Sequence, residues 1–359
     1  MRFVRTLCFL GLIFHASWLP AQGLFSFPNG RRPGSVDQVT SQLQVGGDIL
    51  EMRGGKLDRV KLGGVADMEY MEKTLEVPKG VQGRTRAVRR YSRAEATIRV
   101  GDDALKPTLS PDASLIVAMA DARKSILYSP QQPLSRDEVE LIDTLAGISL
   151  LLDRLLPSGP LAVGHTWKPE PGLLAMLLGL DSVGQSDVQC EVIEVTDTVA
   201  RFQMTGGLAA SIHGATTEVQ LKSKYRYDRR SQRIDWFAMS MKEVRAISLV
   251  AEGFDVVAQV QMRIVPEPGD GGFDQAALSR LPLEPPADSK LLAYNSPKSD
   301  WRLVHDREWF TIRDGTDLVV LHLVRQGSLM ARCQISPLPP APRAKLPTLE
   351  QVQEDVRRA

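Results

Sequence analysis

The sequence lacks the short motifs that mark the common catalytic and nucleotide-binding sites. It contains no Gly-x-Gly-x-x-Gly, Walker loop, His-Glu-x-x-His, Cys-x-x-Cys or Gly-x-Ser-x-Gly pattern. Histidine is also scarce. After the first 21 residues it occurs only as His165, His213, His305 and His322, and no two of these stand at metal-ligand spacing. We therefore expect no metal, no cofactor and no catalytic residue, and we predict that the protein is not an enzyme.

Cysteine is rare, which limits the disulfides that the chain can form. Cys8 precedes the remaining two, Cys190 and Cys333, which lie far apart in different predicted domains. We interpret each of these two as a small buried residue of a strand. A disulfide between them stays open as an alternative, because an export compartment permits one.

The chain has almost no net charge, since 44 basic residues stand against 43 acidic ones. This balance argues against a dedicated nucleic-acid-binding protein. The one basic cluster is RTRAVRRYSR, residues 84–93. Period-two alternation divides its arginines between two faces, so we interpret it as a solvated strand face. A patch for a polyanion or for lipid headgroups is the alternative.

Long apolar runs are absent after the first residues. Residues 1–21 carry Arg2 and Arg5, then an apolar core of signal-peptide length, then a small residue, Ala21, before Gln22. The core is too short to span a bilayer. We predict a signal peptide cleaved after Ala21, hence export to the periplasm or the outside without a transmembrane anchor. An uncleaved anchor is the alternative.

Residues 36–265 predict a curved antiparallel sheet. Residues 22–35, rich in Gly, Pro and Arg, predict a disordered leader before it. Runs with a period of two then alternate with turn residues as far as residue 128, and such runs return from residue 188 to 264. One face of these strands is apolar and the other is charged, so the sheet needs one covering layer.

Two apolar helices between these groups of strands supply the predicted cover. The first, at about residues 135–156, begins with a capping box formed by Ser135 and Glu138 and ends at Pro157. The second, at about residues 171–180, is apolar on every side, which is typical of a helix that is fully buried or faces an apolar cavity.

The Gly- and Pro-rich residues 266–289 predict a linker to a second domain. Residues 290–359 predict a small α/β domain with short antiparallel strands and a C-terminal helix. That helix starts with a capping box at Thr348 and has no stop signal, so we interpret this domain as truncated. The fold class is therefore α+β: a half-barrel covered by apolar helices, followed by a small α/β domain.

The glycine-rich stretch LPSGPLAVGHTWKPE combines a histidine with a tryptophan. No base, acid or metal partner stands near His165 in the sequence. We interpret the stretch as a joint between helix and sheet, in which Gly164 permits a sharp turn and Trp167 anchors the chain. His165 is then an exposed turn residue.

The pattern Val-Gly-x-Thr-Trp at Gly164, Thr166 and Trp167, followed by Tyr225, Tyr227 and Asp228, resembles that of uncharacterised exported bacterial proteins of the planctomycete type. Their fold is similar to the half-barrel of the LolA/LppX-like lipoprotein carriers. The segments YNSPKSDWRL, REWF and TLEQVQEDV resemble the Mog1/PsbP-like α/β domain, whose members are mainly binding or assembly factors. Neither resemblance implies a catalytic residue.

The leading functional hypothesis is a binding protein that encloses a lipid or another apolar small molecule between sheet and helices. The residues that we expect to line this cavity are Leu145, Ile148, Leu152, Leu174, Leu177, Leu178, Val219, Leu221 and Tyr225. A cell-envelope assembly factor with a closed core is the alternative, and a cavity of several hundred cubic ångströms would favour the binding protein. A hydrolase with dispersed residues is a remote alternative that needs a histidine bonded to a carboxylate in a cleft.

Overall fold

The computed structural model describes residues 23–77, 83–121, 124–248, 252–281, 285–296, 301–325, 328–336 and 348–358. The predicted signal peptide, residues 1–21, lies outside the described residues. Within the described ranges, no helix has the length and apolar character needed to cross a membrane.

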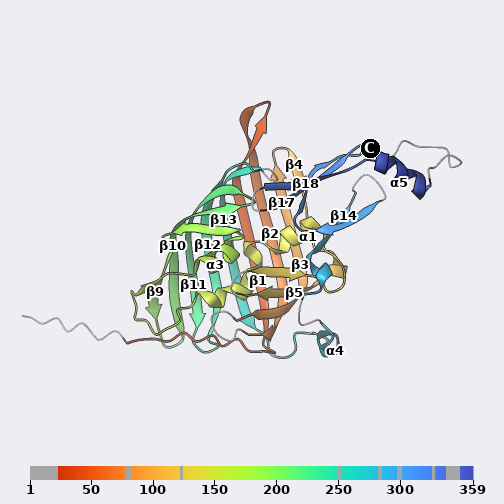
Figure 1. The fold of residues 1–359 in the computed structure, drawn as a ribbon. Helices are drawn as coiled ribbons and strands as arrows, with labels where there is room; N and C mark the ends of the chain where they lie inside the picture. Colours follow the sequence, from red (N-terminus) through yellow and green to blue (C-terminus); the bar gives the residue numbers. More distant parts are fainter. Residues whose placement is uncertain are drawn as a thin grey trace, which may run out of the picture.

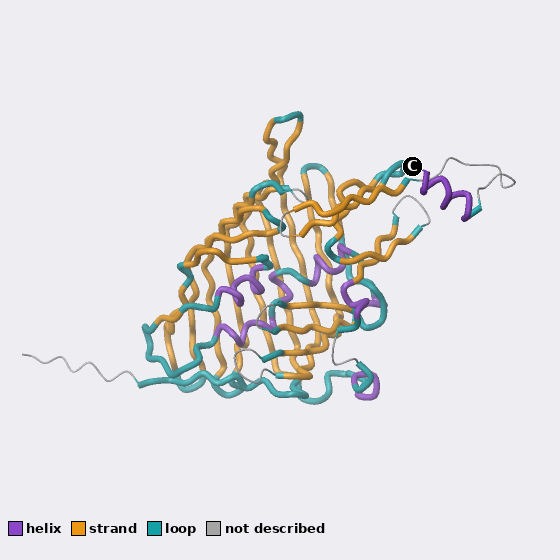
Figure 2. The backbone as a smooth tube through the Cα atoms, viewed as in Figure 1, coloured by secondary structure: helices purple, strands orange, loops and turns teal. Residues whose placement is uncertain are grey.

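One large antiparallel sheet dominates the fold (Figure 1). Its strand order is β6-β5-β3-β2-β1-β13-β12-β11-β10-β9-β7, with β4 attached to β3 and β8 attached to β10. The sheet is strongly curved and open, with β6 and β7 at its two ends (Figure 2). Its strands are β1 (Val36–Arg53), β2 (Lys56–Glu76), β3 (Thr85–Val100), β4 (Asp103–Leu105), β5 (Leu115–Ala120), β6 (Ser125–Tyr128), β7 (Thr166–Trp167), β8 (Ser182–Ser186), β9 (Gln189–Val195), β10 (Val199–Ile212), β11 (Ala215–Asp228), β12 (Arg233–Arg245) and β13 (Gly253–Pro266).

The strands form where apolar and polar residues alternate. In β11, Val219 and Tyr225 face the core, whereas Lys222 and Lys224 face solvent. β11 and β12 form an antiparallel hairpin, paired from Asp228 and Arg233 onward. The sheet therefore has a concave apolar face and a convex polar face.

The two halves of the sheet are joined where β1 pairs with β13, which are its first and last strands in chain order. β1 pairs with β2 on one side and with β13 on the other, over nearly its whole length. Gly47 permits this close pairing, because a Cβ atom at this position would lie 2.3 Å from the carbonyl oxygen of Asp255. The sheet is therefore continuous, although its halves are separated by the apolar segment in the middle of the chain.

The predicted long helix of residues 135–156 is wrong. The capping box of Ser135 and Glu138 is confirmed and starts a helix, but α1 ends at Ile142. Three short turns follow it. At Gly147 the chain folds back against the end of α1, so that a Cβ atom there would lie 2.2 Å from the Ile142 carbonyl oxygen. The backbone of a continuous helix does not bring these two positions so close together. The elements are α1 (Arg136–Ile142), η2 (Leu145–Gly147), α2 (Ser149–Leu152) and η3 (Asp153–Leu155).

The second predicted helix is present as α3 (Pro171–Leu178), and Gly179 ends it in the left-handed conformation with φ 66°. Leu174 and Leu177 of α3 belong to one buried cluster with Leu152 of α2 and with core residues of the sheet. The short helical elements lie on one face of the sheet in Figure 1. The main core of the molecule lies between these elements and the concave face.

The segment expected to be a disordered leader lies against the sheet. Phe27 is 5% exposed and packs edge-on against Phe202 at a centroid distance of 5.0 Å. Arg31 is also 5% exposed. The backbone of Phe25 bonds to that of Leu161 in both directions, at 2.9 and 3.0 Å. We call residues 23–35 the N-terminal strap.

The C-terminal residues form two small antiparallel sheets where we expected one. The first joins β14 (Leu291–Asn295) to β15 (Arg302–Asp306), and Leu292 of β14 belongs to the main core. The second contains β16 (Trp309–Asp314), β17 (Val319–Arg325) and β18 (Ser328–Ile335). The terminal helix α5 (Leu349–Arg358) has the predicted capping box, in which the Thr348 and Gln351 backbone nitrogens each donate to the other residue's side chain.

The predicted linker carries local structure on the sheet. It contains α4 (Gln275–Leu278) and a turn, η4 (Ala287–Lys290). Phe273 and Leu278 form a small buried cluster with Val36 and Val88. This linker is therefore packed against the outer side of β1 and β3, away from the main core.

Candidate functional site

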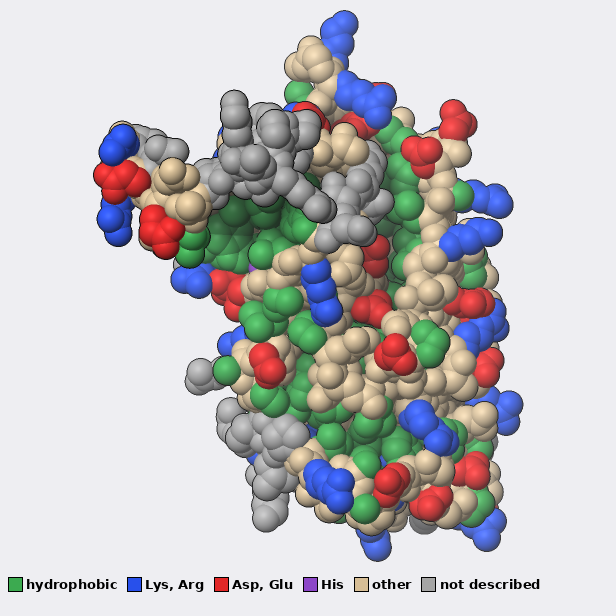
Figure 3. All heavy atoms as spheres, turned by 90° about the vertical axis from the view of Figure 1, so that its right-hand side faces the viewer, with side chains coloured by type: hydrophobic (Ala, Val, Ile, Leu, Met, Phe, Trp, Pro, Cys, Tyr) green, Lys and Arg blue, Asp and Glu red, His purple; other side chains and the backbone are tan. Residues whose placement is uncertain are grey.

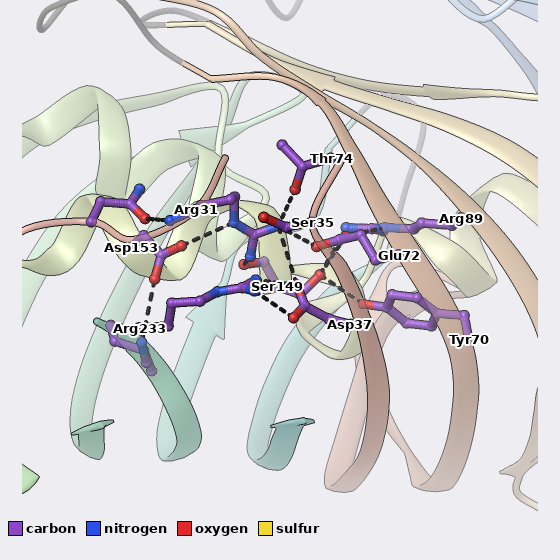
Figure 4. Close-up of polar contacts among 12 residues, drawn as sticks. Arg31, Ser35, Asp37, Tyr70, Glu72, Thr74, Arg89, Ser149, Asp153 and Arg233 are labelled. Atoms are coloured by element: carbon purple, nitrogen blue, oxygen red, sulfur yellow. Dashed lines mark hydrogen bonds and ion pairs between the residues drawn. The ribbon is translucent and has the colours of Figure 1, made fainter. Parts of the chain in front are cut away.

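A group of charged side chains is buried at the concave face of the sheet (Figure 4). Three arginines and three carboxylates balance one another, and each residue is at most 9% exposed. We call this group the buried ion network. Its members are Arg31, Asp37, Glu72, Arg89, Asp153 and Arg233.

Glu72 lies at the centre of the buried ion network. Its carboxylate accepts from Arg31 Nη1 at 2.7 Å, from Arg89 Nε at 2.9 Å and from the Ser149 hydroxyl at 2.8 Å. Burial acts to raise the pKa of Glu72, but Arg89 and then Arg31 outweigh it and lower the pKa to about 2. Glu72 is therefore a fully paired carboxylate and not a proton donor at neutral pH.

Arg31 connects the N-terminal strap to the rest of the buried ion network. Its Nε donates to Asp153 at 3.0 Å, while its Nη1 bonds to Glu72. Asp37 accepts both terminal nitrogens of Arg233 and lies 4.0 Å from Arg31. The turns after α1, residues 145–155, are called the turn segment, and they contribute Asp153 to the network. Arg31 of the strap therefore pairs with a charge of the sheet and with one of the turn segment, and it links all three parts.

The buried ion network also holds the turn segment in place. Arg89 Nη2 donates to the carbonyl of Gly147 at 2.9 Å, and the Ser41 hydroxyl donates to the carbonyl of Ala146 at 2.8 Å. The hydroxyls of Tyr70 and Ser149 bond to each other at 2.9 Å. These bonds fix the backbone of residues 146–149 against the sheet.

Two adjoining cavities open above this turn segment. One has a volume of about 500 Å³ and the other about 460 Å³. Their shared lining residues come from β1, β2, α1 and the segment after α1, and they are Leu43, Val45, Leu62, Glu140 and Thr144. We call the pair the concave cleft. Volumes of this size are typical of small-molecule sites.

The lining of the concave cleft is mainly aliphatic, with charged groups around it. Apolar atoms come from strands on both sides of β1, including Ala96, Ile98, Met241 and Val256. The carboxylates of Glu140 and Asp143, both exposed, also line the cleft. From the side shown in Figure 3, hydrophobic side chains are visible in recesses between charged ones. The cleft thus offers an apolar interior and acidic groups on its lining.

The structure divides the predicted lining residues into two groups. Those that line the concave cleft are Leu145, Ile148, Leu177 and Leu178. The others lie in the closed core, away from the lining of either cavity, and they are Leu152, Leu174, Val219, Leu221 and Tyr225. The second group belongs to the buried hydrophobic cluster between the sheet and the short helices.

The Gly164 to Trp167 stretch enters the sheet at its end. Gly164 has φ 83°, and His165 is exposed. Trp167 Nε1 donates to the carbonyl of Leu155 at 3.2 Å, and its ring packs edge-on against Phe202. Thr166 and Trp167 form β7 and pair with β9. These contacts tie the turn segment to the edge of the sheet.

Two of the remaining histidines contact an aromatic ring or a backbone carbonyl. His213 packs against the ring of Phe310 at 4.7 Å, and His305 Nδ1 lies 2.8 Å from the carbonyl of Asp306. Among the described residues, no His, Cys, Asp and Glu side chains form a group of three or more that could hold a metal ion. Cys190 and Cys333 are free thiols, and burial raises the pKa of Cys190 to about 11.

Sequence reasoning missed the buried ion network. The cluster of residues 84–93 was interpreted as a solvated face, but Arg89 is 1% exposed and Arg86 2%. Arg31 stands in a segment whose composition suggested disorder. One signal was available: Glu72 is a charged residue among the apolar ones of a predicted strand. Its partners are 41 and 17 residues away in the chain, so the sequence did not identify them.

Comparison with known proteins adds little to this geometry. No family model and no curated protein matches the sequence. A lipovitellin structure described by its lipid–protein interactions is 13% identical, with a TM-score of 0.33, over 66% of this chain and 25% of lipovitellin. An outer membrane channel from Pseudomonas putida is 7% identical over 65% of this chain and 96% of the channel, with a TM-score of 0.23. A DUF1329 family protein from Desulfovibrio piger is 12% identical over 68% and 92%, with a TM-score of 0.14. Such distant likenesses carry no argument about function.

Proposed function

We propose that this protein is an exported, non-enzymatic binding protein that holds a lipid or another apolar small molecule in the concave cleft. The observation that carries the proposal is the pair of adjoining cavities, of about 500 and 460 Å³, lined mainly by aliphatic side chains. Transfer of apolar surface from water into such a site is favourable by about 25 cal/mol for each square ångström buried.

The arrangement beneath the cleft supports this proposal. Ser41 and Arg89 fix the backbone of Ala146 and Gly147, which lie between the lining residues Leu145 and Ile148. A wall that is rigid before binding loses less conformational entropy when the ligand enters. The resemblance of the sequence to LolA/LppX-like half-barrel carriers agrees with an apolar ligand, and the N-terminal signal pattern agrees with export.

The alternative function, an assembly factor without a small ligand, is tested by the same experiment. The mature chain, beginning at Gln22, is purified from an exporting host without detergent and examined by native mass spectrometry. A discrete added mass that is lost on organic extraction supports the binding protein and gives the ligand class. A clean apo mass, with no binding of a hydrophobic dye, overturns it in favour of the assembly factor.

A matched pair of variants locates the ligand. Val45 lines both cavities, so Val45→Phe fills the space that they share. We expect it to lower the amount of bound ligand at least about tenfold, because a phenyl ring displaces several ligand atoms. Val257→Phe is the control, since Val257 lies on the neighbouring strand and is 44% exposed. Equal ligand content in both variants would place the ligand elsewhere.

A further inference from the structure

The convex face of the sheet carries a trough along β12. Two successive outward positions of this strand, Ala238 and Ser240, carry short side chains. Ala238 stands opposite Gln261 of β13 and Lys224 of β11, and Ser240 stands opposite Gln259 and Lys222. Because adjacent strands lie only about 4.8 Å apart, short side chains between two rows of long ones leave a groove. Its volume is about 370 Å³.

The walls of the trough present unused polar groups. Gln259 and Gln261 form one wall, and their amides can both donate and accept hydrogen bonds. Lys222 and Lys224 form the other wall, with two ammonium groups. In the part of the chain that the structure describes, none of these four side chains forms a hydrogen bond or an ion pair. Their polar groups are therefore available to a ligand.

One end of the trough is closed by a tryptophan. Trp236 precedes Ala238 by two residues, so it points to the same face of the sheet. Its side chain is half-buried, flanked by Arg226, which is paired with Asp235. An aromatic ring of this kind offers a flat apolar surface beside polar groups. Sugar rings have a matching surface of C–H groups, and their hydroxyls pair with amides.

Two carboxylates of the same face near the trough are already paired, whereas Glu218, four residues before Lys222 on β11, is exposed and forms no ion pair among the described residues. On the far side of β1, Asp67 accepts from Gln42 at 3.0 Å and lies 3.5 Å from Arg93. Beyond β11, Glu191 accepts from Gln203 at 2.6 Å. Among the described residues, the unpaired cations here are Lys222 and Lys224, which line the trough, and the exposed Arg263 beside Trp236, so the charge around the trough is mainly positive.

We propose that this trough binds an anionic linear polysaccharide. A sugar ring stacks on Trp236, its hydroxyls pair with Gln259 and Gln261, and carboxylates of successive residues meet Lys222 and Lys224. A nucleic acid is a poorer match, because its affinity depends on many cationic contacts to phosphates, whereas the trough offers Lys222 and Lys224, with Arg263 beside its tryptophan. The site lies on the face of the sheet opposite the concave cleft, so it is independent of the proposed apolar ligand.

Alginate oligosaccharides of defined length serve as the probe, with dextran as the neutral counterpart. The full mature chain is titrated with each by isothermal calorimetry. We expect alginate to bind and dextran to bind at least about tenfold more weakly, since dextran lacks the carboxylates. Trp236→Ala and the double variant Lys222→Gln, Lys224→Gln each raise the Kd for alginate about tenfold or more.

Two further variants test whether alginate binds in the trough itself or is attracted only by the general charge of the surface. Ala238→Gln fills the floor of the trough and leaves every charge in place, and we expect it to abolish binding. Gln38→Ala removes an exposed amide from the same face, four residues from Gln42 on β1, and leaves binding unchanged. The proposal is overturned if alginate does not bind, if Ala238→Gln binds like the wild type, or if single-stranded DNA binds more tightly than alginate. Thermal unfolding of each variant confirms that it is folded.

Discussion

Arg89 has the largest of the fully buried side chains, and its guanidinium touches three parts of the fold. It pairs with Glu72, donates to Gly147 and lies over the ring of Tyr70 at 4.9 Å. A buried ion pair adds little net stability compared with a well-packed apolar pair, because both charges lose their hydration. Loss of one partner is different, since it leaves the other charge buried.

We therefore expect Arg89→Met to destabilise the protein by about 3 to 5 kcal/mol. The variant removes the main counter-charge of Glu72 and a bond to the turn segment. Arg93→Met is the matched control. Arg93 lies on the same strand and pairs with Glu95, but its side chain is 45% exposed, so the expected loss is below about 1 kcal/mol. Urea unfolding measures both, and equal losses would contradict the structural role of Arg89.

The low pKa of Glu72 makes stability depend on pH in acid. Its folded pKa of about 2 lies below its ordinary value of 4.5, so its contribution is present above pH 4.5 and is lost as the pH falls towards 2. The contribution is about 3 kcal/mol at neutral pH. The free energy of unfolding, measured from pH 7 to pH 2, should fall less steeply below pH 4.5 for Glu72→Gln than for the wild type. Parallel curves would contradict this.

At the scale of elements, the N-terminal strap closes one end of the core. Phe27 packs against Phe202 and Tyr227, and the Tyr227 hydroxyl donates to the carbonyl of Pro28 at 2.6 Å. The strap is thus bound by aromatic packing, a hydrogen bond and the charge of Arg31. A composition rich in Gly and Pro made it seem disordered, because composition does not register single buried side chains.

Phe27→Ala should destabilise the fold by about 3 to 5 kcal/mol, as loss of a buried aromatic ring usually does. Leu24→Ala, in the same strap, removes a side chain that is 69% exposed and should change stability by less than about 0.5 kcal/mol. Thermal unfolding at one pH compares the two. If both variants unfold like the wild type, the strap is not docked in solution.

The elements most open to prediction were those whose signals are local. Both capping boxes, at Ser135 and at Thr348, form as expected because their partners are three residues apart. The predicted length of the helix after Ser135 was wrong. The prediction followed the apolar period and took no account of Gly147, although a glycine in the interior of a helix destabilises it by about 1 kcal/mol relative to alanine. Tertiary bonds from Arg89 and Ser41 then hold this segment as short turns.

At the scale of the molecule, the C-terminal sheet and the main sheet differ in how they are held. Phe310 of β16 lies over the Arg136 guanidinium at 4.7 Å and against His213, and Arg136 donates to the carbonyl of Trp309 at 2.8 Å. β1, by contrast, is paired along both edges. Few contacts therefore oppose a separate opening of β16–β18.

We expect hydrogen exchange to distinguish the two sheets. Amides of β1 should exchange only through global unfolding, with a strong dependence on urea, whereas those of β17 exchange through a smaller opening with a weak dependence. Phe310→Ala should speed exchange in β17 and leave β1 unchanged. The same urea dependence in both strands would show that the chain unfolds as one unit.

Period-two alternation and helix caps act over a few residues, so the sequence alone was enough to predict a curved antiparallel sheet, its apolar face, α3 and the starts of the two capped helices. Of the nine residues expected to line a ligand cavity, Leu145, Ile148, Leu177 and Leu178 lie at the concave cleft, and the other five lie in the closed core. Which residues of the concave face line a cavity, and which pack against one another in the core, depends on the tertiary structure. Arg31, Glu72 and Asp153 find each other across more than 120 residues, and the gap between turn segment and sheet depends on how all the strands curve. Contacts between residues so far apart in the chain cannot be read from a local sequence pattern, because each of these charged residues, taken alone, is compatible with a solvated surface.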